Sequence, residues 1–181
     1  MDLARPLDLC DTLEIQSALE ALAARLAAQR GISSAQSALL QQYVAAMEEI
    51  ASAFGTVSSE LLDQYANMSR RFHQLVFDLA ECSVLQRQVA DEFVSPYPFV
   101  IARAVTQARA EALRKFMLFE QDQHRSLIEA IVQRNSARAE ALAQEHARFN
   151  QRFLALWGEG TLSMVWPHTL IREQGELASA E

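Results

Sequence analysis

Apolar residues recur along most of this chain at intervals of three and four, the spacing that buries one side of an α-helix. The pattern predicts helices over about residues 11–30, 33–54, 58–82, 83–95, 101–134 (with a break near Phe119) and 136–157. No stretch alternates between apolar and polar residues with the period of a strand. The sequence therefore predicts an all-α fold, a single antiparallel bundle of about six to seven helices.

Residues that cap or end helices mark the expected boundaries. Asp11 with Glu14, and Ser33 with Gln36, match the capping-box pattern, and Gly31 lies where the first helix should end. In that helix we expect a buried stripe of Ile15, Leu19, Leu22 and Leu26. Gln16 and Glu20 are then expected on the flank of the stripe.

No linker rich in Pro, Gly or Ser divides the chain. We expect residues 1–10 to form an extended lead-in, residues 11–157 one helical domain, and residues 158–181 a tail whose first half packs back on the domain. The segment SPYPF (95–99) carries two prolines and should be irregular, and Asn135 should cap the last long helix.

The composition favours a soluble helical protein. Half of the 181 residues are hydrophobic, and the chain has only five Gly and four Pro. The net charge of −7 argues against a surface built to grip nucleic acid. No apolar run reaches the roughly 18 residues that cross a membrane, and the start MDLARPLD lacks a signal core, so we expect a cytoplasmic protein.

The two cysteines, Cys10 and Cys82, match no metal or redox spacing. We expect them to be thiols in a reducing cytosol, with a disulfide as the alternative.

Three histidines carry the main functional signal of the sequence. His73, His124 and His146 each lie on the apolar stripe of a separate predicted helix. A buried imidazole needs hydrogen-bond partners or a metal. Two interpretations follow: each histidine is satisfied by its own hydrogen bonds, or the three converge on one site for a divalent metal such as zinc, nickel or manganese.

Familiar catalytic motifs do not occur in the sequence. There is no HExxH, no pair of Glu-x-x-His motifs, no Gly-rich phosphate loop and no G-x-S-x-G. A metal-dependent enzyme would still be possible if Glu120 or Asp122 served as a base beside the histidines. A helical interaction module without chemistry is the other alternative.

Arginines next to the apolar stripes are candidates for binding the carboxylate of a ligand, because a guanidinium meets a carboxylate through two hydrogen bonds. These are Arg71, Arg103 and Arg125. The alternative is that they cover a solvent-exposed face.

Three segments resemble a known family: LEIQSALEALAARLAAQR, RRFHQLVFDLAECSVL and HRSLIEAIVQRNSARAEALAQEHARF. Over about residues 12–153 the chain is similar to the FCD effector-binding domain of GntR-family transcription regulators. The PYPF segment and the tail WPHTLI are also similar to a VanR-like subset whose effectors include aromatic acids.

The resemblance implies a divalent metal held by one Asp and three His, with a small organic acid bound beside it. His73, His124 and His146 match the histidine positions, but Ser69 stands where the family usually has Asp, and Gln16 where it often has Arg. The fourth protein ligand is therefore in question, and three alternatives follow: a metal held by three imidazoles with water or the effector, a metal bound more weakly, or a pocket without metal.

The resemblance also implies a homodimer, for which the apolar faces of the first two helices are candidate contacts. Contact with DNA would require a winged helix-turn-helix, which this sequence does not show ahead of its first helix. We therefore expect this chain to be the effector domain alone. Since no apolar run is long enough to cross a membrane, we also expect no membrane partner.

Overall fold

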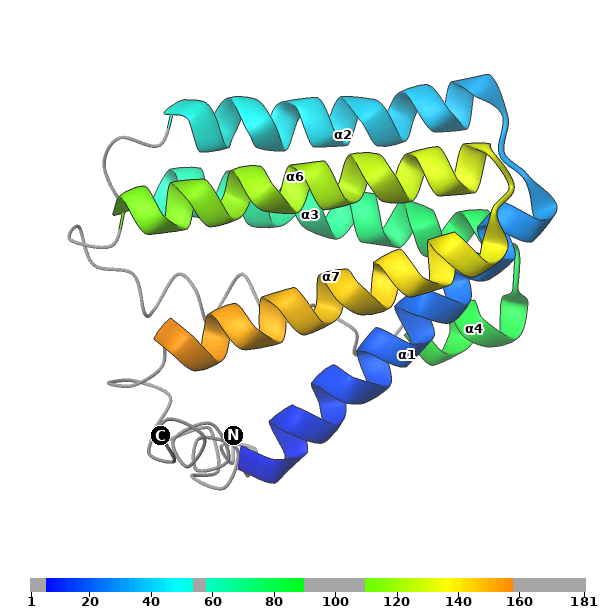
Figure 1. Cartoon of the computed structure of the whole chain (residues 1–181), viewed down its shortest axis with the longest axis horizontal. Coiled ribbons are helices and arrows are strands. Elements are labelled where there is room, and N and C mark those ends of the chain that lie inside the picture. Colours follow the sequence, from blue (N-terminus) through cyan, green and yellow to red (C-terminus); the bar gives the residue numbers. More distant parts are fainter. Residues whose placement is uncertain (1–5, 54–57, 90–109, 158–181) are drawn as a thin grey trace, which may run out of the picture.

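The computed structural model of the chain describes residues 6–53, 58–89 and 110–157 (Figure 1). Its helices are α1 (Pro6–Arg30), α2 (Ser34–Ala53), α3 (Ser59–Leu79), α4 (Ser83–Val89), α6 (Ala110–Val132) and α7 (Ser136–Trp157). The described residues contain no strand, so the all-α prediction is confirmed for them. The SPYPF segment, Arg103 and the predicted tail lie outside these residues.

Helix α6 packs on α1, α2 and α7, and α3 packs on α1, α2 and α4. Helix α2 packs on both of them, and α1 packs on α3, α6 and α7. Figure 1 shows α2 and α6 running side by side, with α7 descending beside α1 below them. Helices α3, α6 and α7 all pack on α1, and these are the helices that carry the three histidines. No helix among the described residues is both long and apolar enough to cross a membrane.

Helix α1 differs from the prediction at its start. It begins at Pro6, so residues 6–10 are not an extended lead-in, and Asp11 lies inside the helix and not at its N-cap. Proline suits the first turn of a helix because its missing N–H has no intrahelical partner there. Cys10 lies in α1 just after this turn, and Cys82 is a half-buried free thiol.

The buried face of α1 also differs from the prediction. Ile15 is 57% exposed, whereas Leu13 and Gln16 are buried. The rest of the buried face consists of alanines, at positions 21, 23, 24, 27 and 28. Apolar residues occur on every side of α1, so their spacing does not select one face. The small alanine side chains allow close packing, and the leucines of the expected stripe lie at the edge of the contact, partly buried.

The other predicted helix ends are mostly confirmed. Ser33 and Gln36 form the reciprocal bonds of a capping box: the Ser33 N–H donates to Gln36 Oε1 (2.8 Å) and the Gln36 N–H donates to Ser33 Oγ (3.2 Å). Asn135 caps α7 by accepting the Arg138 N–H at 3.1 Å. The expected break near Phe119 is wrong, because α6 runs unbroken through this residue, whose side chain is 48% exposed.

The turn after α1 depends on a glycine and a distant arginine. Gly31 has φ +80°, a conformation that side chains rarely adopt, and its N–H donates to Ala27 O at 2.9 Å. The guanidinium of Arg134 donates to the last carbonyls of α1, Gln29 O (2.8 Å) and Arg30 O (3.1 Å). The turn between α6 and α7 thereby holds the C-terminal end of α1.

Gly31→Ala should therefore destabilise the protein. A Cβ at this position would lie 3.1 Å from Arg134 Cζ, and a left-handed backbone costs an alanine about 1–2 kcal/mol. Gly31→Asn is the matched variant, because asparagine tolerates this conformation better, and it should lose less. Urea unfolding measures both. An alanine variant as stable as the wild type would show that the turn carries no such constraint.

Candidate metal centre

Three histidines from three helices meet inside the bundle. His73 (α3), His124 (α6) and His146 (α7) each offer one ring nitrogen, and the three nitrogens lie within 4.8 Å of one another. The ring centroids are 5.3 Å apart for His73 and His124, 4.6 Å for His124 and His146, and 5.5 Å for His73 and His146. The structure thus brings together the three side chains that the apolar stripes selected.

The histidine cluster is shielded from water. His124 is 1% exposed and His146 is 4% exposed, while the side chain of His73 is 17% exposed. The buried ring of Phe72 lies against two of the imidazoles, 4.3 Å from His124 and 5.4 Å from His73 between centroids. A charge placed among these rings would be poorly screened, so its interactions there would be stronger than in water.

The neighbours of His124 determine which of its ring nitrogens carries the proton. The Met117 carbonyl can only accept, so the Gln121 Nε2 that lies 3.1 Å from it must donate. Gln121 Oε1 is then turned towards His124 Nδ1, 3.1 Å away, and accepts its N–H. A neutral His124 therefore keeps a lone pair on Nε2, which is buried and has no hydrogen-bond partner among the described residues.

His146 is held in a similar way. Its Nδ1 lies 2.9 Å from Gln123 Oε1, which accepts the N–H, and its Nε2 accepts from Asn150 Nδ2 at 3.2 Å. The Oδ1 atom of Asn150 is buried without a partner among the described residues. Both buried histidines thus have Nδ1 hydrogen-bonded to a glutamine of α6, and Nε2 carries the lone pair.

Burial keeps these two imidazoles neutral. Loss of hydration lowers the pKa of His124 well below its usual value, and the charges of His146 and His73 lower it further. The same causes, burial first and His73 second, lower the pKa of His146 to about 3. At neutral pH a metal would therefore not have to displace protons from His124 or His146.

A carboxylate from α1 lies on the open side of the cluster. Glu20 Oε2 is 3.7 Å from His73 Nδ1, and Glu20 Oε1 accepts from the Gln16 amide at 3.0 Å. Glu20, His73 and His146 are among the residues that line a small cavity of about 10 Å³. A space of this size holds about one water molecule or one ion.

The donor atoms present fit a divalent transition metal. Three neutral imidazoles are suitable ligands for zinc, nickel or manganese and leave coordination positions open. The unpartnered Nε2 of His124 is a buried acceptor for which a cation would be a partner. Glutamine oxygens on Nδ1 are the kind of outer hydrogen bond that orients a histidine ligand.

A second buried polar group adjoins the cluster. Glu120, 7% exposed, accepts the Tyr65 O–H at 2.8 Å, and its Oε1 lies 4.0 Å from His146 Nε2. Burial raises the pKa of Glu120 to about 7, although hydrogen bonds from Tyr65 and Asn150 act in the opposite direction. Burial also raises the pKa of Tyr65 well above its usual value, and the Glu120 carboxylate adds to this effect.

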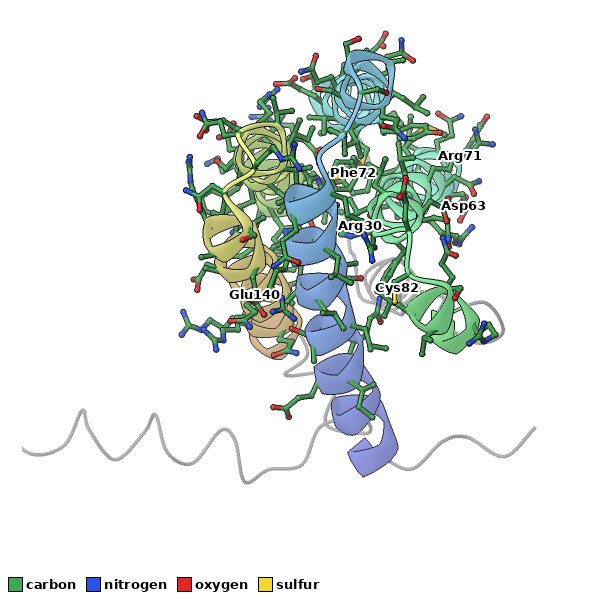
Figure 2. The ribbon with its side chains drawn as sticks, turned by 90° about the vertical axis from the view of Figure 1, so that its right-hand side faces the viewer. Arg30, Asp63, Arg71, Phe72, Cys82 and Glu140 are labelled. Atoms are coloured by element: carbon green, nitrogen blue, oxygen red, sulfur yellow. The ribbon has the colours of Figure 1, made fainter. Side chains whose placement is uncertain are left out.

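Several predicted site residues do not join the histidines. Figure 2 shows Arg71 on the outer side of α3, where it is exposed. Arg125 forms ion pairs with Glu48 and with Asp122, and it lines a separate surface groove between α2 and α6. Asp122, one of the two proposed bases, has a 74% exposed side chain. Neither arginine is thus placed to bind a ligand at the cluster.

Other predictions concern residues near His73. Ser69 is half-buried on α3, one turn before His73, and is neutral. Gln16 was expected on the flank of α1 but is 5% exposed and bonded to Glu20. Sequence reasoning did not select Glu20, Gln121, Gln123 or Asn150 as site residues. Gln121 and Asn150 had a local signal, since Gln121 lies three positions before His124 on α6 and Asn150 four positions after His146 on α7.

Comparison with protein families yields one match relevant to this site. The family model described as the FCD domain matches residues 11–149, which include all three histidines and Glu20. A search among curated proteins gave no matching relative.

Proposed function

The chain belongs to the FCD domain family, the effector-binding domain of GntR-family regulators, and from this premise we propose that it senses a small organic carboxylate at a divalent metal bound by His73, His124 and His146. The convergence of these three side chains carries the proposal. Two of the imidazoles are buried, neutral and hydrogen-bonded at Nδ1, which makes Nε2 the proposed ligand atom. Nε2 of His124 has no partner among the described residues, whereas Nε2 of His146 would exchange its hydrogen bond from Asn150 for the metal. A metal held there would offer a carboxylate a positively charged binding point.

The size of the cavity supports a sensing role. A volume of about 10 Å³ accommodates an ion but not an organic acid. A carboxylate that reaches the cluster must therefore displace a lining element, and the lining residues include Glu20 of α1 and Ala143 of α7. Binding coupled to a helix displacement can shift a conformational equilibrium, which is what a sensor domain requires.

In an intact regulator this displacement would alter the spacing of two DNA-binding domains across a homodimer. Exposed apolar side chains on the first two helices, Ile15 (57%) and Leu39 (38%), support the predicted dimer contact on these helices.

A thermal-shift screen tests the proposed function. The protein is stripped of metal and heated with zinc, nickel or manganese, with and without aliphatic, polycarboxylic or aromatic acids. A ligand at about 100 times its Kd stabilises by about 2.7 kcal/mol, or roughly 5–10 °C in a domain of this size. We expect the acid to stabilise only when metal is present. Arg125→Gln serves as a control and should respond like the wild type. Acid stabilisation that survives a chelator would exclude a metal-centred site.

A second function, metal-dependent hydrolysis, is favoured by one observation. Glu120 lies 4.0 Å from His146 Nε2 with its pKa raised to about 7 by burial, as suits a general base. Turnover of an ester or amide by the metal-loaded protein, lost in Glu120→Gln, would support this function. The FCD match favours the sensor, because FCD domains belong to regulatory proteins.

A further inference from the structure

We propose that Glu20 of α1 is the fourth protein ligand of the three-histidine site and ties α1 to metal occupancy. The inference rests on the proposed metal binding. It starts from a contact: Glu20 Oε2 lies 3.7 Å from His73 Nδ1, and the two side chains are 13% and 17% exposed. Two ligand atoms on one tetrahedral zinc, with bonds of about 2.0–2.1 Å, lie roughly 3.3 Å apart. The observed separation is close to this value, so the proposal requires that His73 bind the cation through Nδ1.

A divalent cation at this site would need negative charge beside it. Three neutral imidazoles contribute no negative charge to a buried divalent cation, and a buried charge requires a compensating partner. Helix α3 does not supply one, since the residue one turn before His73 is the neutral Ser69. Glu120 Oε1 lies 4.0 Å from His146 Nε2, but Glu120 does not line the cavity between His73 and His146, and its Oε2 accepts the Tyr65 O–H at 2.8 Å. Glu20 is the carboxylate that lines the ion-sized cavity together with His73 and His146.

The remaining contacts of Glu20 orient it for this role. One oxygen, Oε1, accepts from the buried Gln16 amide at 3.0 Å, which leaves Oε2 directed towards His73. The three histidines form a group within 4.8 Å that does not include Glu20. The Glu20 side chain must therefore turn further into the cavity when the cation binds, and this movement would pull α1 towards the histidines.

Because Glu20 lies on α1, its binding to the cation would change how α1 is held to the other helices. The three histidines alone would join α3, α6 and α7, whereas α1 is held to these helices largely by an alanine face. A carboxylate ligand from Glu20 would fasten α1 to the other three helices. Removal of the cation should then loosen the part of α1 around Glu20, because the Arg134 hydrogen bonds and the Arg25–Glu140 pair hold the helix nearer to its C-terminal end.

The test compares Glu20→Gln with the wild type. Glutamine preserves the length of the side chain and can still accept the Gln16 hydrogen bond. The matched control is Glu140→Gln on α7, which removes the same charge next to α1, where Glu140 pairs with Arg25 at 3.6 Å. Zinc affinity is measured by competition with a chelator, and the coordination is followed by the visible spectrum of bound cobalt(II).

We expect Glu20→Gln to lower zinc affinity at least 10-fold and to change the cobalt spectrum, while Glu140→Gln changes neither. Amide hydrogen exchange in α1 should slow on zinc binding in the wild type and not in Glu20→Gln. Wild-type affinity and spectrum in a folded Glu20→Gln protein would refute Glu20 as a ligand while leaving the three-histidine site intact. A wild-type protein that binds no zinc or cobalt would overturn the metal site itself, and this inference with it.

Discussion

Replacement of His124 by asparagine should abolish the stabilisation of this protein by divalent cations. The asparagine amide can still donate to Gln121 Oε1, as His124 Nδ1 does at 3.1 Å. The variant lacks the Nε2 atom, which is buried without a partner among the described residues and is the proposed ligand atom of this residue. Loss of an outer hydrogen bond to a ligand lowers metal affinity by about 10–100-fold, so loss of a ligand should lower it by about 100-fold or more.

The readout is the shift in Tm on addition of zinc, nickel or manganese to chelator-treated protein. His124→Asn should melt at one temperature with or without metal. Ile131→Val is the control for general destabilisation, because it removes a methyl group from a fully buried residue of the same helix at a cost of about 1 kcal/mol. It should keep the full metal-dependent shift. A wild-type shift in His124→Asn would mean that metal binds elsewhere.

The convergence of the histidines could be predicted because it depends on local spacing. On α6, His124 shares a helix face with Leu127, Ile128 and Ile131, and all four are buried. Helices that pack through such faces bring their inward residues together. The face of α1 could not be predicted in this way. Its apolar residues occur on every side, and the alanines that pack most closely have a weaker hydrophobic signal than Ile15, which is exposed.

Two of the residues around the histidines come from other helices, so their positions depend on how the helices pack. Gln123 lies next to His124 in sequence but accepts from His146, on α7, at 2.9 Å. Glu20 approaches His73 from a helix 53 positions away in the sequence. Such partners become evident only when the rotation of each helix about its axis is known, and the spacing along one helix does not contain this information.

Glu120→Gln should stabilise the metal-free protein in a pH-dependent way. Burial raises the pKa of Glu120 from 4.5 to about 7, so the folded state holds this proton more tightly than the unfolded state. Below pH 4.5 this carboxyl group is protonated in both states and does not destabilise the folded protein. As the pH rises towards 7, it destabilises the folded protein increasingly. Above pH 7, the difference of about 2.5 pH units between the pKa of the folded and the unfolded state corresponds to a loss of about 3 kcal/mol in the free energy of unfolding. Glutamine can accept the Tyr65 hydrogen bond without carrying the charge.

Urea unfolding at pH 8 and at pH 4.5, in the presence of a chelator, measures this effect. The variant should be more stable than the wild type by up to about 3 kcal/mol at pH 8, and about equally stable at pH 4.5. The difference in the free energy of unfolding between the two proteins is taken at each pH, because the titration of the histidines, which both proteins share, then cancels. The control is Asp122→Asn, since this carboxylate has a 74% exposed side chain and should change stability by less than about 0.5 kcal/mol at either pH. A Glu120→Gln protein less stable than the wild type at pH 8 would show that the ionised carboxylate is stabilised by its surroundings, because burial would then not be the dominant effect on this group.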